Sequence, residues 1–139
     1  MPNYWLLKTE PNTYSYSDLE RDKRTVWDGV TNALALKHLR AMRKGDRAFI
    51  YHSGKEKQIV GIATIARGPY PDPKQTDAKL VAVDLEPREQ LKRPVTLAEI
   101  KARKDFADFE LVRIGRLSVM PVSAQRWKAL CRAATSPHA

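Results

Sequence analysis

The sequence has little cysteine, little glycine and no long apolar run. Its 139 residues include one cysteine and six glycines. A single thiol, Cys131, cannot form an internal disulfide, which is typical of a reducing compartment. No apolar segment approaches the roughly 18 residues that a membrane span requires, and Lys8 and Glu10 come too early for the apolar core of a signal peptide. These absences predict a soluble, cytoplasmic protein.

The motifs of several enzyme classes are also missing from the sequence. It has no glycine-rich phosphate loop, no G-x-G-x-x-G, no G-x-S-x-G serine elbow, no C-x-x-C and no H-E-x-x-H. The histidines, His38, His52 and His138, lack the spacing of metal ligands. His52 and Ser53 are neighbours on a predicted strand, so they point to opposite faces and cannot share a proton directly. We therefore expect no metal, no cofactor and no catalytic residue.

Positive charge, in contrast, is abundant. Lys and Arg number 25 against 16 Asp and Glu, which gives a formal net charge of +9 and a pI of about 9.8. The excess lies in residues 1–53 (9 against 6) and 101–139 (8 against 3), whereas residues 54–100 are nearly neutral (8 against 7). A basic surface attracts phosphate-rich ligands, so the composition favours a nucleic-acid partner.

Alternating apolar residues predict several strands. They fall near residues 4–9, 46–53, 58–68, 78–91 and 117–120. In the first strand, Trp5 and Leu7 share one face, and Lys8 lies on the other face. Gly61 leaves room for a close neighbour within the third strand. Strands outnumber helices, so we expect an α+β domain built on a small, curled, largely antiparallel sheet.

Helices are predicted between or beside these strands. Their positions are near residues 15–22, 32–45 and 96–103, with a last helix that follows residue 123 and buries Trp127 and Leu130. The first helix fits a capping box of Ser17 with Glu20, and the third fits Thr96 with Glu99; Ser123 is expected to cap the last. Gly45 is placed to end the second helix in a left-handed conformation.

Aromatic, polar and basic side chains remain as candidates for a ligand site. The stretch VWDGVTN puts Trp27 before an Asp-Gly turn signal and Asn32 at the start of a helix. A pocket that holds an extruded base needs flat rings, hydrogen-bonding groups for the base edge, and cations for the flanking phosphates. The candidates, in that order, are Trp5, Trp27 and Tyr51; Asn32, Ser53 and Ser118; and Lys8, Lys37, Arg40, Lys44, Arg113 and Arg116.

Each candidate also has a purely structural explanation. Isolated tryptophans are more often part of a core than of a ligand platform. Asn32 is a good N-cap on its own account, and Ser53 can simply begin a turn before Gly54. The stripe of Lys37 and Arg40 is what any solvated helix face can show. Only the combination, in a basic chain without catalytic motifs, favours binding.

Several stretches together resemble one known family. YWLLKTEP, TVWDGVTN, KGDRAFIYHS, IVGIA, YPDP, LKRPVTLAEIK and RLSVMPVS are similar, in order and wording, to the EVE domain. The resemblance implies a PUA-like fold, a curled, mostly antiparallel β-barrel with flanking helices, related to YTH and ASCH domains. It implies a single domain over residues 1–134, and we expect residues 135–139 to form a disordered tail.

The resemblance also implies a ligand site. Positions that match the family's motifs are Trp5, Lys8 and Glu10 in the first strand, Trp27 and Asn32 in W-x-G-V-x-N, Tyr51, His52 and Ser53 in Y-H-S, and Ser118 and Met120 in S-V-M-P. Thr31 stands where many members have arginine, and Ala33 replaces a more polar or aromatic residue. These two departures remove possible contacts to phosphate or base.

The resemblance implies a non-enzymatic domain that binds a modified base, such as methylated or hydroxymethylated cytosine or methylated adenine, in DNA or RNA. Two other functions stay open at this point. One is an enzyme that acts on a nucleotide or RNA, and the other is a protein-interaction module with a basic face. The oligomeric state is open as well, with a monomer favoured.

Overall fold

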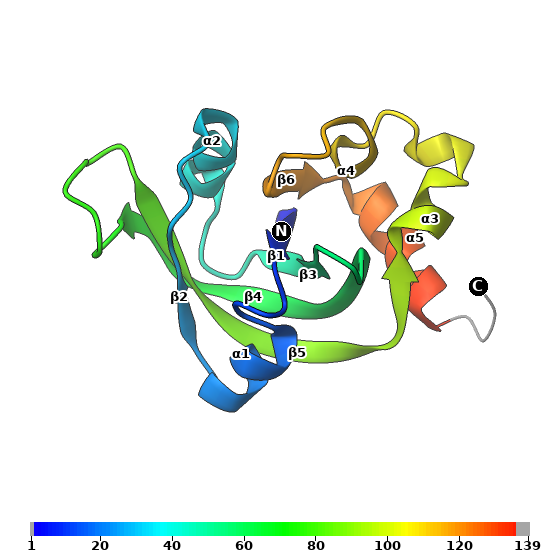
Figure 1. Cartoon of the computed structure of the whole chain (residues 1–139), viewed down its shortest axis with the longest axis horizontal. Coiled ribbons are helices and arrows are strands. Elements are labelled where there is room, and N and C mark those ends of the chain that lie inside the picture. Colours follow the sequence, from blue (N-terminus) through cyan, green and yellow to red (C-terminus); the bar gives the residue numbers. More distant parts are fainter. Residues whose placement is uncertain (1, 136–139) are drawn as a thin grey trace.

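The computed structural model describes residues 2–135, which form six strands and five α-helices. The strands are β1 (Tyr4–Thr9), β2 (Thr25–Trp27), β3 (Arg47–His52), β4 (Gln58–Pro71), β5 (Val81–Thr96) and β6 (Val119–Val122). The helices are α1 (Tyr16–Asp22), α2 (Ala33–Ala41), α3 (Leu97–Lys101), α4 (Glu110–Arg113) and α5 (Ala124–Thr135), with a 3-10 turn at Lys104–Phe106. The predicted α+β class is confirmed (Figure 1).

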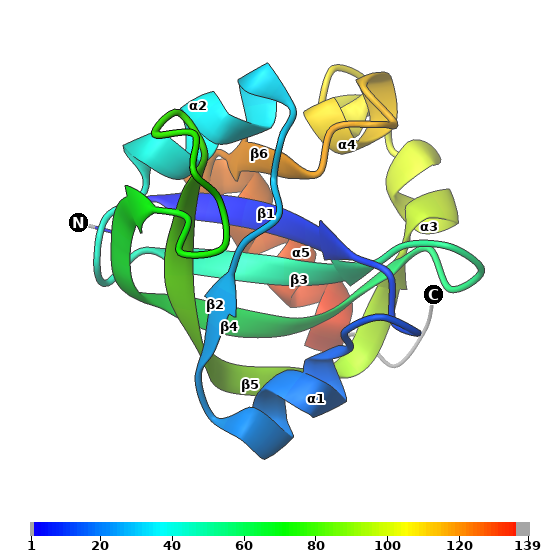
Figure 2. The same ribbon diagram turned by 60° about the vertical axis from the view of Figure 1, so that its left-hand side comes forward.

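All six strands belong to one curled sheet in the order β2-β5-β4-β3-β1-β6. Neighbouring strands are antiparallel except β1 and β3, which are parallel. The prediction of a barrel needs correction, because within residues 2–135 the sheet is open, with β2 and β6 at its two edges. Helix α2 contacts β6 at one edge of the sheet and β5, the neighbour of β2, near the other edge, so it bridges the open side of the curled sheet (Figures 1 and 2).

Strands β1 and β3 form the centre of the core because both of their faces are covered. On one face, Phe49 stacks on Trp127 of α5 with ring centroids 3.9 Å apart, and Tyr4 stacks on the same indole at 4.5 Å. On the other face, Trp5 lies against α2, where its ring centroid is 6.2 Å from that of His38. The predicted alternation along β1 is therefore confirmed.

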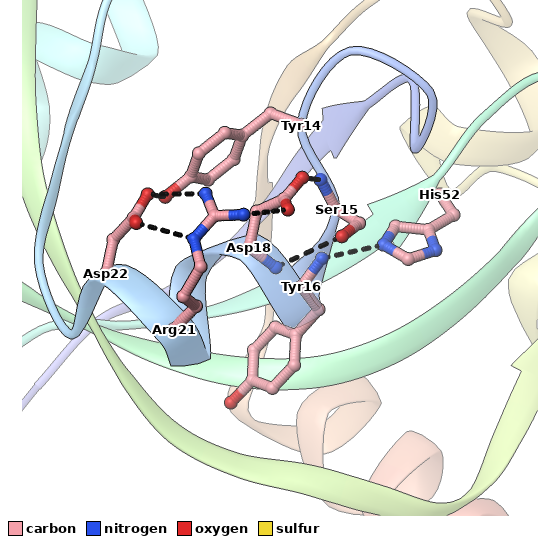
Figure 3. A network of polar contacts seen from close by, with 7 residues as sticks. All are labelled: Tyr14, Ser15, Tyr16, Asp18, Arg21, Asp22 and His52. Atoms are coloured by element: carbon pink, nitrogen blue, oxygen red, sulfur yellow. Dashed lines mark hydrogen bonds and ion pairs between the residues drawn. The ribbon is translucent and has the colours of Figure 1, made fainter.

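The N-cap of helix α1 lies two residues earlier than predicted (Figure 3). Ser15, not Ser17, is the N-cap: its hydroxyl accepts from the Asp18 amide, and the Asp18 carboxylate accepts from the Ser15 amide. Both serines fit the capping-box spacing, so the local pattern could not choose between them. Tertiary contacts decide, because the buried Tyr16 packs against Gly61, where an added Cβ would lie 2.5 Å from its ring. That contact confirms that Gly61 makes room for a close neighbour.

The other caps agree with the sequence except at the end of α2. Thr96 and Glu99 form the predicted capping box, and the Ser123 hydroxyl accepts from the Arg126 amide at 3.1 Å. Helix α2 ends at Ala41, because the next residue is already extended. Gly45 has the expected positive φ of 95°, but it serves the turn before β3.

Helix α5 runs to Thr135, the first residue of the predicted tail. The rest of that tail, residues 136–139, lies outside the described residues, as does His138. No helix of residues 2–135 is long and apolar enough to cross a membrane.

Candidate functional site

A pocket opens where the end of β1 meets the connection from β2 to α2. Its volume is about 380 Å³, within the range of roughly 300–1,000 Å³ that is typical of small-molecule sites. The lining comes from Lys8 and Thr9 of β1, Thr13 and Tyr14 before α1, the continuous segment 25–32, and Ser118 before β6. We call this the tryptophan pocket. Figure 2 shows the β2–α2 connection crossing in front of β1.

Two aromatic side chains, Trp27 and Tyr14, give the tryptophan pocket its flat surfaces. Their rings meet edge to face with centroids 6.3 Å apart, and the indole is 9% exposed. The Tyr14 hydroxyl donates to the Asp22 carboxylate at 2.8 Å (Figure 3), and burial is the main cause that raises the pKa of Tyr14. Tyr14 therefore stays neutral at physiological pH and can stack on a base.

Asn32 combines a structural and a binding role. Its side-chain oxygen accepts from the Ala35 amide at 3.0 Å, which caps α2. This bond uses the side-chain oxygen, so the amino group is the part that remains able to donate to a ligand in the tryptophan pocket, which Asn32 lines. The cap and the ligand contact predicted for Asn32 are therefore compatible.

The loop between Trp27 and Asn32 is held by an aspartate of the proline-rich segment. Gly29 has a φ of 74°, and its amide donates to Asp72 Oδ2 at 3.0 Å. Asp72 is buried, and its other carboxylate oxygen accepts from the Lys74 amide, so this carboxylate joins the two loops. Lys74 Nζ in turn lies 3.3 Å from Asp28. The Asp-Gly pair thus supplies a bend between β2 and α2, at the mouth of the tryptophan pocket.

Lys8 provides positive charge at the edge of the tryptophan pocket. Its ammonium donates to the Gly115 carbonyl at 2.8 Å and lies 5.5 Å from the Tyr51 ring centroid. Burial lowers the pKa of Lys8 below its ordinary value, because the charged form loses hydration. The Lys8 backbone amide donates to the Ser118 carbonyl, which holds Ser118 beside Lys8. An anion beside Lys8 would compensate for the lost water.

The tryptophan pocket brings together Trp27, Asn32, Lys8 and Ser118, but not the other predicted ligand residues. Trp5 is buried behind it and donates its indole N–H to Asp46 Oδ2 at 3.0 Å. Met120 is fully buried. The side-chain contacts of both residues with the protein account for their positions without a ligand.

His52 is engaged on both ring nitrogens. Its Nε2 accepts from the Tyr16 amide at 3.0 Å (Figure 3), and Nδ1 lies 2.9 Å from Glu56 Oε1. Because an amide N–H can only donate, Nε2 is unprotonated and the Nδ1–H donates to the carboxylate. His52 therefore positions the start of α1, and lines a separate polar cavity beside that helix.

Tyr51 and Ser53 line another cavity, on the α3 and α4 side of the sheet. Its volume is about 220 Å³, and Lys8 lines both this cavity and the tryptophan pocket. Glu10 lines neither cavity. Its carboxylate accepts from the Asn12 amide at 3.1 Å and lies against Gly54. Only part of the predicted ligand set therefore lines these two cavities, which share Lys8: Trp27, Asn32 and Ser118 line one, and Tyr51 and Ser53 line the other.

The other cations predicted to bind phosphate lie outside the tryptophan pocket, on α2, in the turn before β3 and on the segment from α4 to β6. Lys37 and Arg40 are exposed on α2, and Arg40 donates to the Lys79 carbonyl at 2.6 Å. Lys44 is exposed in the turn before β3. Arg113 and Arg116 are exposed at the other side, on the segment that carries Gly115 and Ser118.

Sequence reasoning missed the lining residues Tyr14 and Thr9, and it missed Asp72, which holds the lining loop through Gly29. Thr9 donates to the Tyr14 carbonyl at 2.6 Å, which ties the end of β1 to the segment before α1. An aromatic residue in the polar stretch NTYSYSD was the available signal for Tyr14. For Asp72 there was none, because its bond to Gly29 joins residues 43 positions apart.

An α+β domain of this kind, with a pocket beside the β2–α2 connection, has known relatives. A sequence model of the EVE domain matches residues 3–133, and the chain belongs to the EVE domain family, which confirms the resemblance. Human thymocyte nuclear protein 1 is 34% identical over 161 aligned positions, covering 91% of this chain and 72% of that protein.

Solved structures of similar proteins superpose closely on this chain. Rpa0253 from Rhodopseudomonas palustris superposes with a TM-score of 0.91 and 45% identity, over 99% of this chain and 96% of that one. Human THYN1 protein, solved in complex with DNA that contains 5-methylcytosine, superposes with a TM-score of 0.90 and 28% identity, over 98% and 99% of the two chains. An ASCH protein from Zymomonas mobilis, at 14% identity and a TM-score of 0.61 over 94% of each chain, shares the fold alone.

Proposed function

We propose that this chain is a non-enzymatic nucleic-acid-binding domain that recognises a modified base, and that the tryptophan pocket receives that base. The observation that carries the proposal is the pocket itself, which combines the Trp27 and Tyr14 rings, the Asn32 amino group and the Lys8 charge in about 380 Å³. A base extruded from a strand needs such rings for its faces and such donors for its edge.

The preference for a modified base cannot rest on the modification alone. Burying one methyl group contributes about 0.8 kcal/mol, which corresponds to roughly a four-fold preference. Stacking on aromatic rings adds about 1–3 kcal/mol per base but is nearly blind to base identity. Sharp discrimination therefore requires hydrogen bonds to the base edge. In this chain, Asn32 and Ser118 are placed to make them.

Methylated cytosine in DNA is the ligand that we propose first. The support is the human THYN1 protein, whose structure contains 5-methylcytosine DNA and superposes on 98% of this chain. Hydroxymethylated cytosine, methylated adenine and RNA are the variations to be compared, since the same ring and amide groups can hold other modified bases.

Fluorescence titration of the tryptophans tests the proposal. Matched short oligonucleotides, unmodified or with one methylated or hydroxymethylated cytosine or methylated adenine, would be added to wild type and to Trp27→Ala. We expect quenching that is stronger for one modified oligonucleotide, and affinity at least ten-fold weaker in Trp27→Ala, because stacking is lost. Equal affinity of wild type for all oligonucleotides would refute recognition of a modification, and an unaffected Trp27→Ala would refute the pocket.

A further inference from the structure

The cavity beside the tryptophan pocket has several hydrogen-bond donors among its lining residues, together with the apolar Leu97, Leu111 and Val112. We call it the lysine cavity: it lies between the β3–β4 turn, α3 and α4, and its polar lining includes Lys8, Lys57, Lys101, Tyr51 and Ser53. No carboxylate is among the described side chains that line it. At about 220 Å³ it is smaller than the tryptophan pocket and too small for a typical drug-sized ligand.

Tyr51 gives a specific sign that the lysine cavity takes a ligand. The residue is only 3% exposed, and its hydroxyl has no hydrogen-bond partner among residues 2–135. Because no fully buried polar side-chain atom in that part of the chain lacks a partner, this hydroxyl must reach the cavity surface. Burial raises the pKa of Tyr51, so the group keeps its proton and can donate.

The three lysines also have donor capacity left. Lys8 gives one of its three ammonium hydrogens to the Gly115 carbonyl. Lys57 and Lys101 form no ion pair with any described residue. A tyrosine hydroxyl and three lysines among the residues that line one small cavity favour a compact anion with several acceptor oxygens, which is the chemistry of a phosphate group.

A backbone hydrogen bond joins the two segments that carry Lys57 and Lys101. Lys57 has a φ of 49°, and its carbonyl accepts from the Leu97 amide at 2.8 Å, which joins the β3–β4 turn to the start of α3. Lys101 is on the last turn of that same short helix. Lys8 then links the lysine cavity to the tryptophan pocket, because it lines both.

We infer that the lysine cavity is a phosphate subsite that binds a backbone phosphate next to the base held in the tryptophan pocket. The inference rests on the proposed function for the identity of the strand, whereas the subsite itself rests on Tyr51, Lys57 and Lys101. Of the three lysines, the sequence predicted only Lys8 as a ligand contact, and Lys57 and Lys101 were not among the candidates.

The test compares Lys57→Gln/Lys101→Gln with a matched control, Lys23→Gln/Lys128→Gln, which removes two exposed lysines that line neither cavity. Binding of a 5-methylcytosine oligonucleotide and its unmodified twin would be measured across a salt series. We expect the cavity variant to bind both about ten-fold more weakly than the control does, with the ratio between them unchanged. Its log–log salt slope should also be smaller by about 0.7–0.9, the value for one lost phosphate contact.

A second arm locates the phosphate. Replacing one phosphate beside the modified base by a neutral methylphosphonate should weaken binding to wild type and to Tyr51→Phe, but should cause no further loss in the cavity variant. If the methylphosphonate weakens wild type and cavity variant equally, or if the cavity variant binds like the control, the inference is overturned.

The remaining outcomes separate the inference from the proposed function. Equal wild-type affinity for the modified and unmodified oligonucleotides would refute base recognition. The comparisons of the lysine variants and of the methylphosphonate strand would still support or refute the phosphate subsite. Titration with inorganic phosphate distinguishes the source of the anion. If the lysines hold free phosphate but do not affect oligonucleotide affinity, the backbone-phosphate inference is overturned.

Discussion

At the scale of single residues, Asn32 has to serve the fold and the ligand at once. Its carbonyl oxygen caps α2 through the Ala35 amide, and its amino group remains for the tryptophan pocket. A serine hydroxyl also caps helices well, but it lacks the amino group. Two substitutions at one position can therefore separate the roles.

We expect Asn32→Ser to keep the stability of wild type and to lose most of the preference for the modified base. Asn32→Ala should lose that preference too and should in addition be destabilised by about 1 kcal/mol, the usual effect of losing an N-cap. Urea unfolding and oligonucleotide titration of the two variants provide the check. If Asn32→Ser discriminates as well as wild type, Asn32 is a cap and nothing more.

Lys8 is expected to contribute to binding at the expense of stability. Its lowered pKa means that folding disfavours the charged ammonium, and this unfavourable contribution is fully present at neutral pH. Lys8→Met should therefore leave the free energy of unfolding unchanged or raise it by up to about 1 kcal/mol. Oligonucleotide affinity should fall about ten-fold, since a hydrogen bond from a charged group contributes about 1.5–3 kcal/mol.

The stability difference between Lys8→Met and wild type should change with pH in one direction. As pH rises through the lowered pKa toward 10.5, folded wild type loses the proton that folding disfavours. The stability difference between Lys8→Met and wild type should then shrink. A variant that is much less stable than wild type at pH 7 would show that the bond to Gly115 outweighs the cost of burying the charge.

At the scale of elements, one ion pair joins β5, α3 and α5. Arg93 of β5 contacts the Glu99 carboxylate of α3 through both terminal nitrogens, at 2.9 and 3.0 Å, and also donates to the Ala133 carbonyl of α5 at 2.8 Å. The hydrogen bonds from Arg93 are the main cause that lowers the pKa of Glu99 below its ordinary value of 4.5. Glu99 therefore stabilises the fold in its ionised form.

We expect Glu99→Gln to destabilise the protein by about 1 kcal/mol at pH 7, because a hydrogen bond to a charged group is lost while the amide oxygen can still cap α3. The stabilisation is fully present above pH 4.5 and is lost as pH falls through the lowered pKa of the folded state. Unfolding of wild type and variant between about pH 7 and pH 3 should show the two converging. Glu20→Gln, at an exposed position on α1, is the control that should show no such convergence.

Five of the six strands followed from the sequence, because period-2 alternation is a local property, but the three-residue strand β2 was not predicted. Trp5 and Lys8, three residues apart on β1, were already assigned to opposite faces, and the structure puts the indole on Asp46 and the ammonium on Gly115. The same alternation could have shown that Trp5 and Lys8 do not share a pocket. The ligand residues were instead grouped by side-chain type and by the family resemblance.

What could not be predicted depends on contacts between distant residues. The choice of Ser15 over Ser17 follows from the burial of Tyr16, whose hydroxyl donates to the Ile62 carbonyl 46 positions away. The open sheet follows from where α2 packs. The division of the site into two cavities follows from the position of α3 beside the β3–β4 turn, which no local pattern encodes.

At the scale of the whole molecule, positive charge surrounds the tryptophan pocket from two directions. Lys37 and Arg40 lie on α2, whose first turn borders the pocket, and Arg113 and Arg116 lie on the segment leading to Ser118. Some of the other cations form ion pairs, as in Arg24 with Asp84 and Arg126 with Asp108. Part of the net charge of +9 therefore lies on the two segments that flank the tryptophan pocket.

Affinity for any oligonucleotide should accordingly fall steeply with salt, because each phosphate contact releases counterions and adds about 0.7–0.9 to the log–log slope. We expect Lys37→Gln/Lys44→Gln to lower that slope by about 1 to 2 and to weaken modified and unmodified strands alike, since phosphate contacts carry no base information. Arg40 is kept in this variant because it also holds the Lys79 carbonyl. Binding across a salt series, with Lys23→Gln/Lys128→Gln as the control of equal charge, provides the measurement. A slope equal to that of the control would place the strand away from α2, and a flat salt response of wild type would indicate a small free ligand rather than a nucleic-acid backbone.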